Sequence, residues 1–279
     1  MKRIVPIVTT LAIATTIGVS SCKQETAIEP SNTIEFTALT GSATFKLLNS
    51  AGDYNRDSDL VYFDSAAIVL PTAIYNQDIT ALQDTIIAAA FDTLNVDHSA
   101  AMHSAFVAAA SEAGYALDSI PTNADQRFNS DGNTIISGDI FSLTPHLLTY
   151  RISKEVYLPG AAHGMTINHY LTYNIDEACL MPLSYIFTEE GINELPAIIA
   201  SRAKDLARQL GPTEIKTLPA NDNYYIDLNG TIVFVYEPYE AASFAQGELA
   251  IPFYPFQLSE LMTDQGRNLF HLESEEAAN

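Results

Sequence analysis

The sequence predicts an α+β fold in which mainly antiparallel sheets pack with a few helices, as two intimately associated halves. Alternating apolar and polar residues predict strands over much of 34–70 and again over 147–175. Helical spacing of apolar residues is confined to three other stretches: 76–91, 97–113 and 192–210. Strands and helices therefore come in blocks, which is typical of the α+β class and not of alternating βαβ units.

The N-terminal half is expected over residues 34–146. After its first strands, a helix is predicted over 76–91 because its apolar residues share one face: Ile79, Leu82, Ile86 and Ala90. A second helix is predicted over 97–113, with Asp97 as the N-cap and Gly114 as the end. Alternation returns over 127–136 and predicts a strand there.

The C-terminal half is expected over residues 147–263. Strands are predicted over 147–158 and 165–175, and the long helix over 192–210 follows them. The Asn229-Gly230 pair between apolar strands predicts a tight hairpin, because both central residues of such a turn favour positive φ. A strand over 247–253 and a short helix over 257–262 close this half, and the polar residues 264–279 predict a flexible tail.

The first 21 residues have the organisation of a secretory signal peptide. Lys2 and Arg3 precede an apolar stretch, and small residues stand directly before Cys22. The stretch is shorter than the ~20 residues that a spanning helix needs, so we expect cleavage. The ending Val-Ser-Ser-Cys over 19–22 is similar to a lipobox, which predicts a diacylglycerol-modified Cys22 followed by a tether over 22–33. A soluble secreted protein is the alternative.

Lipidation would leave Cys179 as the remaining cysteine, so no intrachain disulfide is expected. The anchor predicts a place in the cell envelope. Lys23 stands where an aspartate retains some bacterial lipoproteins in the inner membrane, which favours the outer membrane.

The chain is strongly acidic, with 13 Lys and Arg against 34 Asp and Glu and a formal net charge of −21. Nucleic acid is therefore excluded as an expected partner, because phosphate binding needs clustered basic residues. An anionic membrane surface would also repel the chain, which leaves the lipid as its one expected membrane contact. Such a field would attract a basic partner, although acidity also serves solubility alone. We expect a monomer without a cofactor.

Four short segments in a fixed order resemble one family. They are Gly-Ala-Ala-His-Gly at 160–164, Leu-Ser-Tyr-Ile-Phe at 183–187, Val-Phe-Val-Tyr-Glu-Pro-Tyr-Glu-Ala at 233–241 and Ile-Pro-Phe at 251–253. Together they resemble the extracellular domain of RsiV-type anti-sigma receptors, which also forms the non-catalytic region of PdaC-type peptidoglycan deacetylases. The resemblance runs from Leu60 to Met262 and is strongest from Leu147. It suggests a PdaC-type half over 34–146 and an RsiV-type half over 147–263.

The resemblance implies a binding module, because receptors of this type bind lysozyme through this domain. No sigma-factor-binding segment, transmembrane segment or deacetylase metal motif is recognisable in the sequence. We therefore expect capture, inhibition or surface binding without transmembrane signalling by this polypeptide and without deacetylation.

Three residues are candidates for ligand binding: His163, His169 and Tyr239. The two histidines lie six residues apart and share one face if the strand is regular. A metal site or catalysis at His163 is conceivable, but turn geometry with a hydrogen-bonded imidazole explains the same motif better. Tyrosine offers contact area at a low entropic cost, although Tyr239 also fits a core position of the resembled family.

Residues 53–64 are similar to a calcium-binding loop. Oxygen-bearing side chains fall at the ligand positions, namely Asp53, Asn55, Asp57, Asp59 and Asp64. Ser58 replaces the glycine that usually makes the sharp turn, and the flanking residues read as strands. A polar hairpin loop is the simpler interpretation.

The leading functional hypothesis is a lipid-anchored extracytoplasmic protein that binds a basic protein such as lysozyme, or a cell-wall component. We do not expect an enzyme, because the sequence has no Gly-x-Ser-x-Gly motif, no usable Cys-His pair and no phosphate-binding loop. The alternatives are an enzyme that acts on envelope glycans through His163, and a structural envelope lipoprotein without a small ligand.

Overall fold

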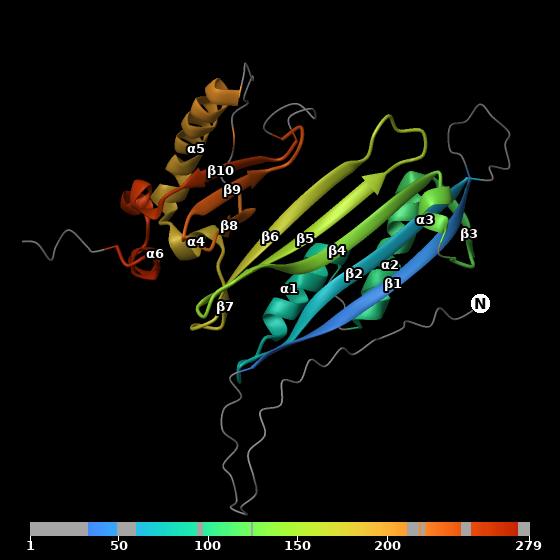
Figure 1. Cartoon of the computed structure of the whole chain (residues 1–279), viewed down its shortest axis with the longest axis horizontal. Coiled ribbons are helices and arrows are strands. Elements are labelled where there is room, and N and C mark those ends of the chain that lie inside the picture. The colour runs from blue at the N-terminus through green and yellow to red at the C-terminus, as the bar shows by residue number, and fades with distance from the viewer. Residues whose placement is uncertain are drawn as a thin grey trace, which may run out of the picture. The chain divides into compact units, whose positions relative to one another are not determined.

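The computed structural model describes residues 33–48, 60–93, 97–123, 125–210, 218, 221–240 and 247–272, and it confirms the α+β class (Figure 1). A seven-stranded sheet has the order β3-β1-β2-β4-β5-β6-β7. In chain order its strands are β1 (Ile34–Leu48), β2 (Val61–Ile74), β3 (Tyr115–Ile120), β4 (Gly132–Leu143), β5 (Leu147–Tyr157), β6 (Met165–Asn174) and β7 (Cys179–Leu180).

A second sheet has the order β10-β9-β8 and consists of β8 (Tyr224–Ile226), β9 (Ile232–Tyr236) and β10 (Leu249–Phe253). The helices of the described residues are α1 (Thr80–Phe91), α2 (His98–Ala113), α3 (Gln126–Asn129), α4 (Leu183–Ile186), α5 (Glu189–Leu210) and α6 (Asp264–Leu269). None of the described helices combines the length and the apolar character that crossing a membrane requires.

The chain divides into two compact units. Unit 1 comprises Met1–Asp139 and Ile152–Thr166, and unit 2 comprises Ile140–Arg151 and Ile167–Asn279. This division differs from the consecutive halves that the sequence suggested, because β4, β5 and β6 each contribute residues to both units.

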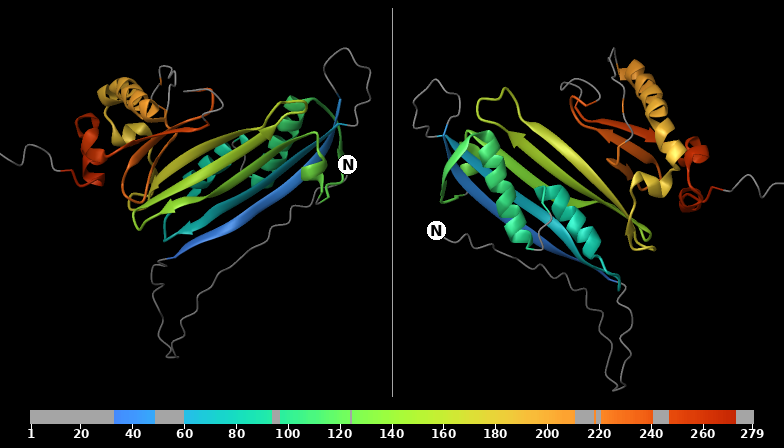
Figure 2. Two further views of the ribbon diagram at one scale, coloured as in Figure 1. Left: turned by 45° about the horizontal axis from the view of Figure 1, so that its top comes forward. Right: turned by 180° about the vertical axis from the view of Figure 1, so that it is seen from behind.

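In unit 1, α1 and α2 cover one face of the sheet (Figure 2). Strands β1 and β2 pair antiparallel from Ile34↔Ile74 to Lys46↔Val61, whereas β2 and β4 pair in parallel from Tyr62↔Gly132 to Ile68↔Gly138. Alternate residues of β2 face the helices, and they pack with Leu82, Ile86 and Ala90 of α1 and with Ala101, Met102, Phe106 and Ala110 of α2 to form the buried core.

Local capping explains the limits of α1 and α2. The Asp97 carboxylate accepts hydrogen bonds from the backbone N of Ser99 (3.0 Å) and Ala100 (3.1 Å), and α2 ends at Gly114, so both predictions are confirmed. Helix α1 begins at Thr80 and not at residue 76. The Asp78 carboxylate accepts hydrogen bonds from the Thr80 backbone N and hydroxyl, which holds residue 78 in the turn before the helix.

In unit 2, one helix and the small sheet enclose the core. The apolar stripe of α5 packs Leu195, Ile199 and Ala203 against buried residues of β8, β9 and β10. The predicted hairpin is present, but its turn is longer than the Asn229-Gly230 pair. The Asp227 backbone N donates to the Thr231 carbonyl and the Gly230 backbone N donates to the Asp227 carbonyl, both at 3.0 Å, and of the pair only Gly230 has a positive φ, at 78°. Helix α5 starts at Glu189, three residues before the predicted start.

Other sequence predictions need correction. Residues 126–129 form α3 before β4 begins at Gly132, so the expected strand over 127–136 starts late. The expected helix over 257–262 is two 3₁₀ turns, Pro255–Gln257 and Ser259–Leu261. The flexible tail that was predicted from residue 264 is wrong at its start, because Asp264–Leu269 form α6.

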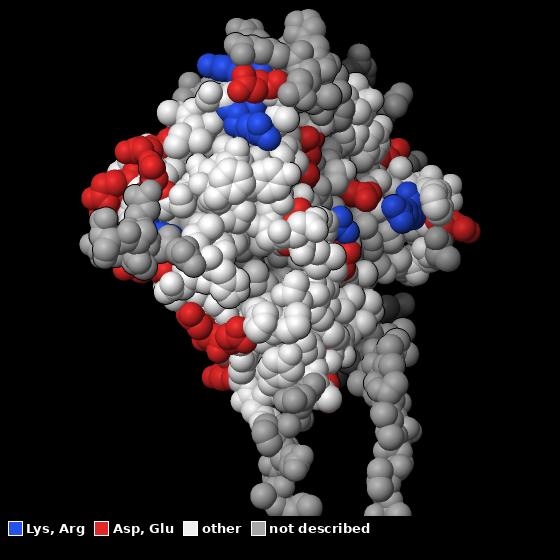
Figure 3. All heavy atoms as spheres, turned by 60° about the vertical axis from the view of Figure 1, so that its left-hand side comes forward, with Lys and Arg blue, Asp and Glu red and all other residues white. Residues whose placement is uncertain are grey.

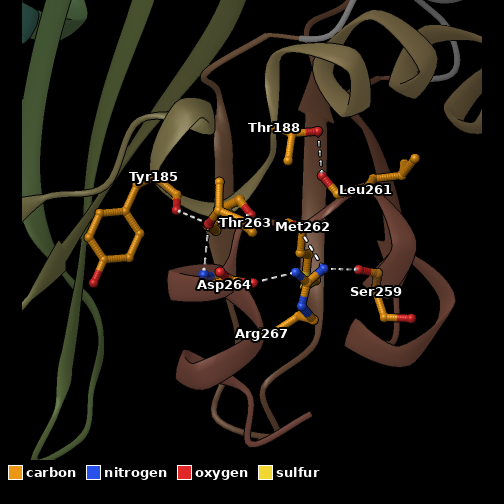
Figure 4. A network of polar contacts seen from close by, with 10 residues as sticks. Tyr185, Thr188, Ser259, Leu261, Met262, Thr263, Asp264 and Arg267 are labelled. Atoms are coloured by element: carbon orange, nitrogen blue, oxygen red, sulfur yellow. Dashed lines mark hydrogen bonds and ion pairs between the residues drawn. The ribbon is translucent and has the colours of Figure 1, made fainter. Parts of the chain in front are cut away.

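Helix α6 is held by a network of polar contacts (Figure 4). The Thr263 hydroxyl donates to the Tyr185 carbonyl at 2.9 Å and accepts from the Gly266 backbone N at 2.9 Å. The Arg267 guanidinium donates to the Met262 carbonyl at 2.8 Å and also contacts Asp264. These bonds satisfy backbone groups that would otherwise lack partners at the ends of short helices.

Candidate binding site

Several residues singled out in the sequence lie outside the described residues. They are Cys22 and four positions of the calcium-loop candidate, Asp53, Asn55, Asp57 and Asp59. Lipidation and calcium binding therefore stay predictions.

Asp64, the twelfth position of that loop, lies within β2 and is fully buried in unit 1. Its Cα partners are Ala43 in β1 and Thr134 in β4. Neither carboxyl oxygen has a partner in hydrogen-bonding geometry, and the hydroxyl of Thr134 instead pairs with the Tyr62 hydroxyl at 2.8 Å. Burial raises the pKa of this carboxyl to about 8, and the nearby Thr134 hydroxyl and the charge of Lys154 oppose that rise without cancelling it. Asp64 thus belongs to the core of unit 1.

The two candidate histidines have different surroundings. His163 is exposed in the connection before β6, and its Nδ1 donates to the Gly164 carbonyl at 3.1 Å. His169 lies in β6 and is half-buried. Burial lowers its pKa, although the charge of Asp222 acts in the opposite direction. The lowered pKa favours the neutral imidazole of His169, and the ring of His163 makes a local hydrogen bond to the next residue in the chain.

Tyr239 lies in a tight turn after β9. The Glu240 backbone N donates to the Glu237 carbonyl at 3.0 Å, Pro238 is the second residue of the turn, and Tyr239 has φ 72°. A proline followed by a residue with positive φ is the pattern of a type II turn, in which glycine usually takes the third place. Tyr239 is 54% exposed. A tyrosine held in this strained and exposed position suggests a functional reason for its presence.

Glu237 and Glu240 are the first and last residues of this turn, and a third glutamate, Glu248, precedes β10. We call these three glutamates and Tyr239 the acidic turn. The Glu240 carboxylate accepts from the Glu237 backbone N at 3.0 Å. Asn168 in β6 joins the other two: its backbone N donates to Glu237 Oε1 at 2.7 Å, and its side-chain Nδ2 donates to Glu248 Oε2 at 2.8 Å. One asparagine thus ties the ends of β9 and β10 to β6.

Asn223 fixes the position of Asn168. Its Oδ1 accepts from the Tyr170 backbone N at 2.9 Å, and its Nδ2 donates to the Asn168 carbonyl at 2.9 Å. The amide side chain bonds the backbone of β6 as a neighbouring strand would. The acidic turn is therefore anchored to β6 through Glu237 and Glu248, while the side chains of Tyr239 and Glu240 are exposed.

Electrostatics at the acidic turn favour an incoming positive charge. Burial, and then the negative charges of Glu248 and Glu240, raise the pKa of Glu237 to about 7 despite the hydrogen bond from Asn168. Its Oε2 is buried without a hydrogen-bond partner. A cationic group beside the turn would offset the repulsion among the three carboxylates.

An aromatic cluster lies in the same unit. Phe141, Tyr170 and Tyr225 have ring centroids 4.8–5.1 Å apart, and the Arg151 guanidinium lies 5.5 Å from the centroid of Phe141. Tyr170 is buried, and burial raises its pKa to about 12. The cluster consequently packs residues of β4, β5 and β6 against β8, and its Tyr170 lies two residues from Asn168 in β6.

Over the part of the chain that the structure describes, no three His, Cys, Asp or Glu side chains are grouped so that they would hold a metal ion. The face of unit 2 that carries α5 and α6 has a broad uncharged area with acidic side chains around it and few basic ones (Figure 3).

Sequence reasoning named Tyr239 as a candidate but did not group it with Asn168, Glu237 and Glu248. Glu237 and Glu248 are eleven positions apart, and Asn168 is a further 69 positions from Glu237, so no local spacing connects them. A signal was present in the Tyr-Glu-Pro-Tyr-Glu segment over 236–240, where proline and flanking carboxylates indicate a turn that gathers charge.

Comparisons with protein-family models and with curated proteins give no match. Among solved structures, the chain is similar to a DUF3298 family member from Bacteroides fragilis, with 16% identity and a TM-score of 0.63 over 88% of this chain and 100% of that one. It is also similar to a DUF3298 family protein from Pseudomonas aeruginosa, with 11% identity and a TM-score of 0.56 over 84% and 96%. At these identities the likeness concerns the backbone, and the chain has the fold of DUF3298 family proteins.

Proposed function

We propose that this protein is a lipid-anchored extracytoplasmic binding protein, and not an enzyme, that captures a basic protein such as lysozyme at its acidic turn. The resemblance of its motifs to the lysozyme-binding domain of RsiV-type receptors supports this proposal, and the DUF3298 fold is compatible with it. A cell-wall component is the other ligand class that the motifs suggest.

The observation that carries the proposal is the arrangement of the acidic turn. Three carboxylates are held together by backbone and amide donors, and an exposed tyrosine stands between two of them. Tyrosine and arginine are enriched where proteins recognise each other, and a basic partner would bring lysine or arginine to the carboxylates. The net charge of −21 would steer such a partner toward the protein over longer distances.

The purified full-length chain should bind immobilised lysozyme saturably, and the binding should weaken as salt rises because the charges become screened. The double variant Glu240→Gln, Glu248→Gln should weaken binding roughly tenfold, or about 1.4 kcal/mol. Glutamine keeps the oxygen that accepts from Glu237 or Asn168, so the turn persists while its negative charge falls.

The affinity for lysozyme should also rise from pH 6 to pH 8, since Glu237 ionises near pH 7 while lysine and arginine stay protonated.

The double variant Glu190→Gln, Glu194→Gln, an equal change of charge at two exposed positions of α5, is the matched control and should leave binding nearly unchanged. Absence of salt-sensitive binding in the unmodified chain would reject lysozyme as the partner. An equal loss in the Glu190, Glu194 double variant would show a general charge effect and would remove the acidic turn from the proposal.

The lipid anchor is tested separately in cells of a bacterium that lipidates exported proteins. The unmodified protein should fractionate with membranes, and Cys22→Ser should release it, because no thiol remains to receive the lipid. Expression of Ser20→Ala provides a control that changes the signal region and keeps the cysteine. Retention of the Cys22 variant in the membrane fraction would contradict lipid anchoring.

A further inference from the structure

Two aromatic rings stand parallel and exposed on a single turn after β10. The ring planes of Tyr254 and Phe256 differ by 6°, and their centroids lie 5.8 Å apart. Tyr254 is 57% exposed and Phe256 is 66% exposed. Large apolar side chains are normally exposed one at a time, so a parallel exposed pair calls for an explanation.

The backbone holds this pair in place. The Tyr254 backbone N donates to Gln257 Oε1 at 2.9 Å, and the Gln257 backbone N donates to the Tyr254 carbonyl at 2.9 Å. Pro255 lies between the two aromatic residues and fixes its own φ. Leu258, which follows Gln257, is buried in the core of unit 2. The rings are therefore presented by an ordered turn, which lowers the entropic cost of binding a ligand.

We propose that Tyr254 and Phe256 form a stacking platform for a neutral pyranose sugar. One face of a pyranose carries several C–H groups with partial positive charge, which complement the negative face of an aromatic ring. The Tyr254 hydroxyl and the Nε2 of Gln257 add polar groups at the rim for the sugar hydroxyls. This platform and Glu248 of the acidic turn lie at opposite ends of β10, and the inference does not rest on the proposed function.

The surrounding charges decide which ligand class fits. From Leu249 to Gly266 the sequence contains no Lys or Arg, while Glu260 and Asp264 are acidic. Arg267 follows, but its guanidinium is bound to the Asp264 carboxylate and to the Ser259 and Met262 carbonyls. Phosphate groups and anionic lipid headgroups would meet repulsion there, and sulfated or uronic sugars would too. An uncharged sugar such as N-acetylglucosamine meets no such repulsion, and its acetyl methyl group adds apolar contact.

Saturation-transfer difference NMR with the full-length protein and chitotetraose, a neutral oligomer of N-acetylglucosamine, tests the platform. We expect saturable transfer at millimolar sugar, strongest at the ring C–H and acetyl protons. The double variant Tyr254→Ala, Phe256→Ala should lower the affinity at least about tenfold. Both side chains are exposed and the backbone bonds of the turn remain, so the variant should fold, which circular dichroism will check.

Phe128→Ala removes a single aromatic ring that is 83% exposed on α3 and serves as the matched control. Unchanged sugar binding in that variant supports the platform. No transfer in the unmodified protein, or equal transfer in the double variant, would overturn it. Ring-dependent binding to phosphatidylcholine vesicles without sugar binding would also overturn it and would assign the rings to a membrane. Unchanged lysozyme capture by the double variant would show that the two surfaces act independently.

Discussion

Asp64→Asn is expected to make the protein more stable at pH 7 and to remove most of a pH dependence of folding. The carboxyl of Asp64 is fully buried, has no hydrogen-bond partner and has a pKa of about 8 in the folded protein. An unfolded aspartate has a pKa near 3.8, so at pH 7 folding must place a proton on this group. That protonation costs about 4 kcal/mol at pH 7.

The sign of the effect follows from proton binding. Between about pH 4 and pH 8 the folded state holds a proton that the unfolded state has released, so stability falls as pH rises. Above pH 8 both states are ionised and the slope disappears. Asparagine does not titrate, but its buried amide lacks partners at a cost of about 1–3 kcal/mol. The net gain at pH 7 is therefore about 1–3 kcal/mol, and it should grow by about 1.4 kcal/mol per pH unit between pH 5 and pH 8.

Urea unfolding of the full-length protein and the Asp64→Asn variant at several pH values measures this difference. Asp84→Asn, the same chemical change on the exposed side of α1, controls for the loss of one negative charge. Parallel stability profiles of the Asp64 variant and the unmodified protein would contradict the buried neutral carboxyl. A variant that is less stable at every pH would show that Asp64 has an ionic partner in solution.

The sequence was sufficient where local chemistry determines structure. The Asp97 cap, the Gly114 end of α2 and the Asn229-Gly230 turn each depend on residues within a few positions of one another. They needed no knowledge of distant contacts. The cap and the helix end are confirmed, and the hairpin is present with a longer turn.

The parts that the sequence did not predict depend on distant partners. Alternation identifies β2 and β4 as strands but does not reveal that they pair in parallel across the intervening α1, α2, β3 and α3. A charged residue such as Asp64 suggests a surface loop until its register places it opposite Thr134 in the core. Asn168 became a site residue only through bonds to Glu237 and Glu248, which the fold supplies.

The same reasoning explains why α6 was taken for a flexible tail. Its residues Asp-Gln-Gly-Arg-Asn-Leu have no apolar stripe and include a glycine, so propensity argues against a helix. Its stability instead comes from contact with α4. The Thr263 backbone N donates to the Ile186 carbonyl at 2.9 Å, and Gly266 is buried directly against that carbonyl.

Gly266→Ala is therefore expected to destabilise the protein, although alanine is the better helix former. An added Cβ would lie 2.3 Å from the Ile186 carbonyl oxygen and 3.0 Å from its carbon, and backbone atoms cannot move away as a flexible side chain can. Separating α6 from α4 would also weaken the Thr263–Ile186 bond. We expect a loss of about 3 kcal/mol in the free energy of unfolding, against the gain of about 1 kcal/mol that helix propensity alone would give.

Denaturant unfolding separates these two effects by their sign. Asn268→Ala, at an exposed position of the same helix, should leave stability unchanged or raise it slightly, because only propensity changes there. Gly191→Ala at the start of α5 should repeat the loss, since its added Cβ would lie 2.3 Å from the Leu261 carbonyl oxygen. A stabilising Gly266→Ala would mean that α6 does not rest on α4. The short polar segment that follows Met262 would then be the loosely held end that its composition suggests. The expected fall in the free energy of unfolding would instead show that this segment is a structural part of unit 2.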